Sequence, residues 1–172
     1  MLVTISGGAG AGKTTLATAL AGQRNGVVVL HLDDYCHEAR DVGDPSSVDF
    51  ANLDADVAGA LASQAVVVAE GMFAFRVGVA AKPGARFDVF ADLPADLRLA
   101  RKIRRQCVEG ETELDLLLTN YVTYRRAAHE RHVEPARQIA DLVVSTESPA
   151  EQLAAVIWQA ITKRRLRSSP TS

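Results

Sequence analysis

A glycine-rich run near the N-terminus has the residue types and spacing needed to hold phosphate groups. Strand-like residues Leu2–Ser6 lead into Gly7-Gly8-Ala9-Gly10-Ala11-Gly12-Lys13-Thr14-Thr15, and a helical pattern covers Lys13–Ala21. The run matches Gly, any four residues, then Gly-Lys-Thr, a pattern whose backbone N–H groups point at phosphate oxygens. We expect Lys13 to reach the β- and γ-phosphates of a bound triphosphate and the Thr14 hydroxyl to ligate Mg²⁺. A simple glycine turn would not require a lysine and a threonine at these places.

The nucleotide-binding residues predicted from this run are listed here. They are Gly7, Gly8, Ala9, Gly10, Ala11, Gly12, Lys13, Thr14 and Thr15.

Acidic residues follow two further strand-like segments. Asp33 and Asp34 come after Val27–Leu32, and Glu70 comes after Ala65–Ala69. In an open α/β sheet, ligands bind beyond the carboxyl ends of the strands, so these carboxylates should converge on the phosphate loop. Phosphoryl transfer to a hydroxyl needs a carboxylate that accepts its proton, for which Asp33 or Asp34 is suitable, and Glu70 could support Mg²⁺. The alternative for the aspartate pair is an Asx turn or a helix cap that closes the strand.

A basic helix is expected over Pro94–Glu109. Arg98, Arg101 and Arg105 are spaced i, i+3 and i+7, which places them on one helix face. In a phosphotransferase such a helix acts as a lid whose guanidinium groups neutralise charge on the transferred phosphoryl group. In an arbitrary protein the same spacing would be a solvated basic face.

Aromatic residues and histidines provide further candidates. Phe73 and Phe75 follow Glu70 closely, and we expect one of them to border the substrate pocket. His129 and His132 lie in a charged stretch without metal-ligand spacing, and are interpreted as surface or substrate-side residues.

Apolar runs that alternate with helical patterns predict an α/β fold of three layers, with a parallel sheet covered by helices on both faces. The strands are expected at Leu2–Ser6, Val27–Leu32, Ala65–Ala69, Phe87–Ala91 and Ile139–Ser145.

Two helix starts carry capping signals. Ser46 and Asp49 could form a capping box before a helix marked by Leu53, and Ser148 with Pro149 begins the last helix. The core face predicted for that last helix consists of Leu153, Val156, Ile157, Ala160 and Ile161.

Length and composition limit the other possibilities. The 172 residues suit one domain: we expect a domain at 1–166, with a lid over about 94–112, and a flexible tail at 167–172. A net charge of −2 argues against a nucleic-acid or membrane partner, and no apolar run approaches the roughly 20 residues that span a bilayer. The two cysteines, Cys36 and Cys107, favour a reducing compartment, so a cytoplasmic location is predicted. The sequence leaves open whether the chain forms a homo-oligomer.

The phosphate loop alone does not select one class of nucleotide-binding protein. The Asn-Lys-x-Asp motif of GTPases is absent, and the one Asp-x-x-Gly match, Asp56-Val57-Ala58-Gly59, lies inside a predicted helix. A small-molecule kinase therefore remains, which uses ATP and Mg²⁺ to phosphorylate a hydroxyl of a small-molecule acceptor. The alternative is a regulatory or interaction protein that binds nucleotide and hydrolyses it slowly.

Together these residues resemble the uridine kinase / phosphoribulokinase family, which includes nicotinamide riboside kinases. The resemblance covers most of the chain, in order, through Gly7–Thr14, Leu32-Asp33-Asp34-Tyr35, Glu70-Gly71, Asp96–Arg105, His132-Val133-Glu134-Pro135 and Ala140–Val144. It implies a P-loop NTPase fold whose five-stranded parallel sheet has the order 2-3-1-4-5, with a helical lid. It also implies that Asp33 is the base and that Arg101 and Arg105 are the lid arginines. Its acceptor side would involve Asp33, Tyr35, Asp44, Glu70 and Phe73.

Three differences from uridine kinases concern the lid and the acceptor side. Gln106 follows Arg105 where the family usually has Asp, and Gly43 stands where uridine kinases hold the sugar hydroxyls with an Asp, although Asp44 is adjacent. The helix at 53–63 also leaves no room for the hairpin that closes over the pyrimidine. The resemblance therefore implies the kinase fold and a nucleoside-like or sugar-like acceptor, without implying uridine.

Overall fold

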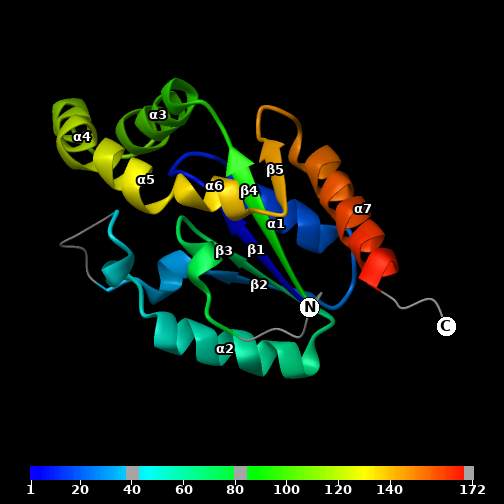
Figure 1. The fold of residues 1–172 in the computed structure, drawn as a ribbon. Coiled ribbons are helices and arrows are strands. Elements are labelled where there is room, and N and C mark those ends of the chain that lie inside the picture. Colours follow the sequence, from blue (N-terminus) through cyan, green and yellow to red (C-terminus); the bar gives the residue numbers. More distant parts are fainter. Residues whose placement is uncertain (38–42, 80–84, 169–172) are drawn as a thin grey trace.

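A five-stranded parallel sheet forms the centre of the protein in the computed structural model, which describes residues 1–37, 43–79 and 85–168. The strands have the order β2-β3-β1-β4-β5, which confirms the predicted order (Figure 1). Their bounds are β1 Leu2–Ser6, β2 Val27–His31, β3 Val66–Glu70, β4 Arg86–Asp92 and β5 Leu142–Ser145.

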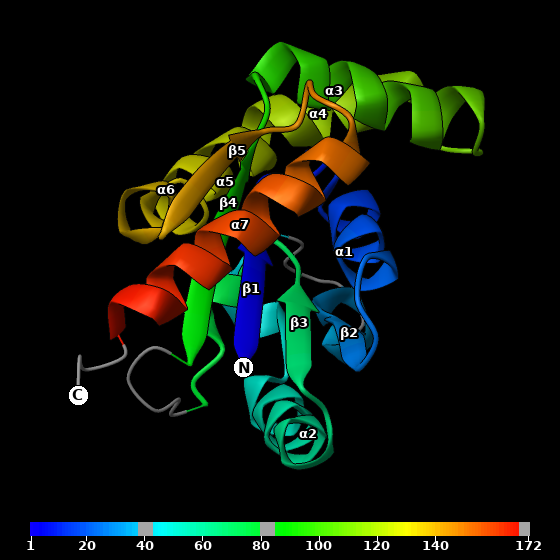
Figure 2. The same cartoon turned by 90° about the vertical axis from the view of Figure 1, so that its right-hand side faces the viewer.

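Helices cover both faces of the sheet, as the apolar strand patterns predict. Helices α1 and α7 pack against each other on one face, and α2 lies on the opposite face (Figures 1 and 2). The helix bounds are α1 Lys13–Gly22, α2 Phe50–Ser63, α3 Ala95–Ile103, α4 Leu114–Asn120, α5 Arg126–His132, α6 Pro135–Ile139 and α7 Ala150–Ser168.

Short helical turns extend several of these elements. Two π-helical turns, Arg104–Val108 and Tyr121–Arg125, continue α3 and connect α4 to α5. Helices α3 and α4 lie beyond the carboxyl ends of the strands, where ligands bind in open α/β sheets (Figure 1). In the part of the chain that the structure describes, 3₁₀ turns occur at Leu32–Tyr35, Pro45–Ser47 and Ala74–Arg76.

The alternation of side chains along the central strands builds two separate apolar cores. Val3 and Ile5 of β1 point into the core beneath α1 and α7, while Leu2 belongs to the core beneath α2. Burial of each large aliphatic side chain in these cores contributes roughly 1.5–3 kcal/mol. Trp158 of α7 packs in the first core and donates its indole N–H to the Leu20 carbonyl at 3.1 Å, so its polar atom is satisfied. These cores fix α1, and with it the phosphate loop, against the sheet.

Several boundaries differ from the sequence predictions. Strand β2 ends at His31 because Leu32 begins a 3₁₀ turn, and β5 begins only at Leu142 because Ile139 ends α6 with 68% of its surface exposed. The predicted core position Val156 is also wrong, since it is 46% exposed and Ala154 is buried instead.

The start of α2 differs from the predicted capping box. Asp49 is itself the N-cap, because its carboxylate accepts the Asn52 N–H at 3.0 Å. Ser46 lies in the preceding 3₁₀ turn, where its N–H donates to Asp44. Only α2 lies between Val48 and β3, so the segment contains no hairpin, as the sequence indicates.

The C-terminal helix continues beyond the predicted end of the domain. Helix α7 reaches Ser168, and residues 169–172 of the predicted tail lie outside the described residues. Within the described part of the chain, none of the helices has the length and apolar character needed to cross a bilayer.

Candidate active site

The phosphate loop is packed closely against the first turn of the basic helix. Gly10 has φ +84°, and a Cβ atom at this position would lie 2.6 Å from the Arg98 carbonyl oxygen. A Cβ on Gly8 would collide with the Arg98 guanidinium group. Glycine at these two positions therefore allows α3 to approach the loop backbone. Lys13 folds back over the loop and donates to the Gly8 carbonyl at 3.1 Å.

A cavity of about 750 Å³ opens beside this loop, at the carboxyl edge of the sheet. It is large enough for a nucleotide or a drug-sized ligand. Residues from the loop, the ends of β2 and β3, and the basic helix all line it, among them Ala9, Gly10, Gly12, Lys13, Thr14, Thr15, Asp33, Glu70, Phe73, Arg101, Lys102 and Arg105. The remaining predicted loop residues, Gly7, Gly8 and Ala11, shape the loop without lining the cavity.

Glu70 connects three elements at the floor of the cavity. This carboxylate is only 5% exposed, and its Oε1 atom accepts the Thr14 hydroxyl at 2.9 Å. The same oxygen lies 2.7 Å from His31 Nδ1. His31 was not predicted as a site residue, although His31 and Glu70 end adjacent parallel strands in register. Glu70 is thus held by the phosphate loop on one side and by β2 on the other.

The donors around Glu70 suit a hard divalent cation. The Thr14 hydroxyl and the Glu70 carboxylate are oxygen ligands of the kind that Mg²⁺ prefers. Glu70 Oε2 forms no hydrogen bond to any described residue, so it can accept one from a metal-bound water. No group of three or more His, Cys, Asp or Glu able to hold a metal occurs among the described residues. Mg²⁺ usually binds through one or two protein groups together with substrate phosphates.

The two neighbouring aspartates, Asp33 and Asp34, both lie in the 3₁₀ turn Leu32–Tyr35. Asp33 lines the cavity, and Asp34 does not. Successive side chains in a 3₁₀ turn point in directions that differ by roughly 120°, so the two carboxylates point different ways. Asp33 is the carboxylate of the pair that faces the ligand space.

Charges from several elements act on Lys13. Burial lowers the pKa of its amine, and the nearby cations Arg105 and Arg98 act in the same direction. The carboxylates of Glu70 and Asp33 raise it and oppose this effect. A triphosphate bound in the loop would add negative charge and favour the ammonium form.

The three arginines expected on one helix face have different surroundings. Arg101 and Arg105 line the cavity, and Arg101 donates to the Thr146 carbonyl at 3.2 Å. Arg98 lies under the phosphate loop, donates to the Leu93 carbonyl at 3.0 Å and contacts the His129 ring at 3.2 and 3.4 Å. Arg98 therefore braces the phosphate loop and does not point into the main cavity.

His129 is consequently not a surface residue. Its side chain is 17% exposed, and burial followed by the Arg98 charge lowers its pKa. Its Nε2 atom lies 3.2 Å from the carboxylate of Glu134, the N-cap residue of α6.

Two residues predicted for the acceptor side, Tyr35 and Asp44, do not line the main cavity. The Tyr35 hydroxyl donates to Asp56 of α2 at 2.7 Å, and burial with this hydrogen bond raises the pKa of Tyr35 to about 12. Asp44 caps the turn Pro45–Ser47 and lies 3.7 Å from His132 Nε2. Its neighbour Gly43, by contrast, lines the cavity.

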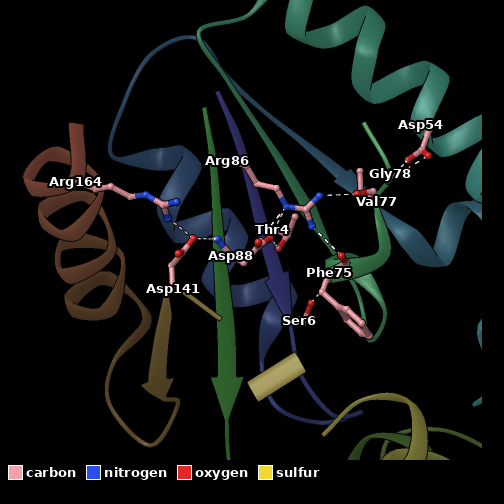
Figure 3. Close-up of polar contacts among 10 residues, drawn as sticks. All are labelled: Thr4, Ser6, Asp54, Phe75, Val77, Gly78, Arg86, Asp88, Asp141 and Arg164. Carbon is pink, nitrogen blue, oxygen red and sulfur yellow. Dashed lines mark hydrogen bonds and ion pairs between the residues drawn. The ribbon is translucent and has the colours of Figure 1, made fainter. Parts of the chain in front are cut away.

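The loop after β3 carries Phe73 into the cavity and is held from behind by Arg86. Arg86 of β4 donates to the carbonyls of Phe75 at 2.8 Å and Val77 at 2.6 Å (Figure 3). Its Nε also donates to both oxygens of Asp88, at 2.8 and 3.0 Å, and Asp88 accepts the Thr4 hydroxyl. A polar clamp therefore fixes the loop to the central strands.

Further contacts hold the same loop at its two ends. The Phe75 N–H donates to the Ser6 hydroxyl at 2.9 Å, and the Gly78 N–H donates to the Asp54 carboxylate on α2 (Figure 3). Phe73 is 2% exposed in this arrangement, so it forms a fixed wall.

Comparisons with known proteins agree with this architecture. Residues 35–152 match the phosphoribulokinase / uridine kinase family. The uridine kinase of Deinococcus deserti is 28% identical over 83% of this chain and 86% of its own length, and that of Staphylococcus aureus is 22% identical over the same shares. Two solved structures share the fold, each with a TM-score of 0.61. One is an uncharacterised protein from Eubacterium ventriosum, which is 15% identical and matches over 94% of this chain and 98% of its own. The other is shikimate kinase from Acinetobacter baumannii in complex with shikimate, which is 21% identical and matches over 96% of this chain and 94% of its own.

Proposed function

The chain belongs to the phosphoribulokinase / uridine kinase family and is an ATP-dependent small-molecule kinase, and from this premise we propose how its own residues carry out the transfer. The acceptor is a hydroxyl of a compact nucleoside-like or sugar-like molecule. Asp33 accepts the hydroxyl proton, and Lys13 binds the phosphates of the nucleotide. Arg101 and Arg105 stabilise the charge on the transferred group.

One observation carries this proposal. A phosphate loop, the carboxylate of Asp33 outside it and two arginines of a separate helical segment, Arg101 and Arg105, all line a single cavity. Phosphoryl transfer requires positioning and charge stabilisation above all, and these groups supply both. A protein that only binds nucleotide would not need Asp33 at the acceptor side of the same cavity.

The proposed steps follow from the placement of the groups. The triphosphate lies along the phosphate loop, with its γ-phosphate toward Lys13. The acceptor occupies the side formed by Asp33 and Phe73, and Asp33 takes its proton as the oxygen attacks. Thr14 and Glu70 would hold Mg²⁺, which when bound would supply positive charge to the phosphate groups. His31 holds Glu70 in place through the 2.7 Å contact.

Asp33→Asn tests the proposal because it keeps the shape of the side chain and removes the base. We expect kcat for ADP formation with an acceptor to fall by roughly 10²–10⁴, with nucleotide affinity nearly unchanged. Asp34→Asn is the matched control, since Asp34 does not line the cavity, and it should retain most of the activity.

The same assay without acceptor separates the proposal from its alternative. A regulatory nucleotide-binding protein would hydrolyse ATP slowly at a rate independent of any acceptor. Acceptor-independent hydrolysis that Asp33→Asn leaves unchanged, with no acceptor phosphorylated in a screen of nucleosides and sugars, would refute the kinase assignment of this site.

A further inference from the structure

Two cations at the edge of the active-site cavity are not needed for the phosphate loop. Lys102 of α3 and Arg125, in the turn before α5, are both half-buried. Both line the main cavity, and both also line an adjoining cavity of about 330 Å³. They therefore stand at the junction of the two spaces.

The other cations around the smaller cavity already have partners. Arg98 packs against His129, and Arg126 forms an ion pair with Glu130 at 3.2 Å. Within residues 1–37, 43–79 and 85–168, neither Lys102 nor Arg125 forms a salt bridge. Burial, followed by repulsion from Arg125 and Arg105, lowers the pKa of Lys102, and burial lowers that of Arg125.

The carboxylates of the main cavity cannot neutralise these two cations. Glu70 is engaged by Thr14 and His31, and the charge of Asp33 acts on Lys13. Glu130, which lines the smaller cavity, pairs with Arg126, so among the described residues neither Lys102 nor Arg125 has a paired carboxylate. Half-buried positive charges in this situation are costly, and such an arrangement is typical of a site that receives an anion.

The position of the two cations indicates which ligand supplies that anion. Apart from Ala9, no residue of the phosphate loop reaches the smaller cavity. Gly43 and Met72, like Lys102 and Arg125, line both cavities. Gly43 and Met72 lie in the segments that follow β2 and β3, on the acceptor side. Arg101 and Arg105, which line only the main cavity, remain for the triphosphate.

We propose that the phosphoryl acceptor carries an anionic group, a phosphate monoester or a carboxylate, in addition to its reactive hydroxyl, and that Lys102 and Arg125 bind this group. The proposal rests on the kinase function assigned above and makes its substrate class narrower. A neutral nucleoside would leave the two cations without a partner, so it should be a poor acceptor.

Calorimetric titration of the protein saturated with Mg²⁺ and a non-hydrolysable ATP analogue tests this. Ribose 5-phosphate is compared with ribose, and shikimate with methyl shikimate, so that the two pairs distinguish a phosphate from a carboxylate. In at least one pair the anionic probe should bind roughly tenfold to a hundredfold more tightly, as expected for charge-assisted hydrogen bonds. Arg125→Gln and Lys102→Gln should each remove most of that preference.

Arg104→Gln is the matched control. Arg104 is on the same helical segment, is 79% exposed and lines neither cavity, so this variant should keep the preference. The analogue is titrated first, in a separate run: failure to bind there counts against the proposed kinase function. Normal analogue binding without an anionic preference in either pair overturns only the present inference. The inference is also overturned if Arg125→Gln weakens binding of the ATP analogue as strongly as binding of the anionic probe, because Arg125 would then serve the triphosphate.

Discussion

The clamp formed by Arg86 connects the stability of the fold to the shape of the acceptor side. Arg86→Met keeps much of the side-chain length but removes four hydrogen bonds, two to Asp88 and one each to the Phe75 and Val77 carbonyls. The Arg86 and Asp88 side chains are each 25% exposed, so the pair is largely shielded from water. The change therefore leaves a carboxylate and two carbonyls without their donor.

The magnitude follows from these contacts. Breaking a buried ion pair by removing one partner costs about 3–5 kcal/mol, and Asp88 still accepts the Thr4 hydroxyl at 2.6 Å, which places the expected loss near the lower end. A loss of about 3 kcal/mol in a domain of this size lowers Tm by about 6–12 °C. Arg104→Met is the comparison: the Arg104–Glu109 pair is mostly exposed, and such pairs contribute about 0–1 kcal/mol.

Kinetics distinguish a clamp from a general loss of stability. The loop that Arg86 holds carries Met72 and Phe73 into the cavity, whereas the phosphate loop is held by other contacts. At a temperature where Arg86→Met remains folded, KM for the acceptor should rise about tenfold while KM for the nucleotide changes less than twofold. A variant that melts within about 2 °C of the parent, or whose two KM values rise together, would refute this reasoning.

Two further predictions concern the lid and the proton of a tyrosine. Arg105→Ala should lower kcat more than it raises KM for the nucleotide, because a lid arginine acts mainly on charge that develops in the transition state. Steady-state kinetics of this variant, with Arg104→Ala as the control, would check this. An effect on KM alone would contradict the prediction. The Tyr35 pKa of about 12 lies above the value of about 10 in an unfolded chain, so the tyrosine's contribution to stability is complete below pH 10 and is lost as pH rises toward 12. Chemical denaturation at pH 9–11.5 should show this loss in the parent and not in Tyr35→Phe, and equal slopes would argue against the raised pKa.

Features encoded by neighbouring residues could be predicted from the sequence. The phosphate loop lies within a single short segment, and β1 and β3 are short, mostly apolar runs that are buried along their whole length, so the local pattern was sufficient for both. Two strand boundaries were predicted less well. The apolar run of β2 continues into Leu32, which already belongs to a 3₁₀ turn, and the apolar residue Ile139 precedes β5 but still belongs to α6. Hydrophobicity alone does not mark such a change of backbone conformation.

Roles that depend on tertiary contacts could not be predicted in the same way. The grouping of Arg98 with Arg101 and Arg105 assumed a regular α-helix, but a π-helical turn begins at Arg104, and Arg98 is drawn to the phosphate loop and to His129. No local signal indicated that His129, 31 residues further along the chain, would meet it. Lys102, which the sequence did not single out, lines both cavities.

His31 is different, because a signal for its position was present in the sequence. Once the order 2-3-1 places β2 beside β3, the last residues of two parallel strands of similar length come into register, which puts His31 next to Glu70. Glu70 Oε1 then accepts from Thr14 and lies against His31, so the ends of β2 and β3 and the start of α1 share one oxygen atom. Because this oxygen is occupied, only Oε2 remains available toward the ligand space. The sheet order therefore determines both where the Thr14 hydroxyl points and which oxygen of Glu70 can serve a metal-bound water.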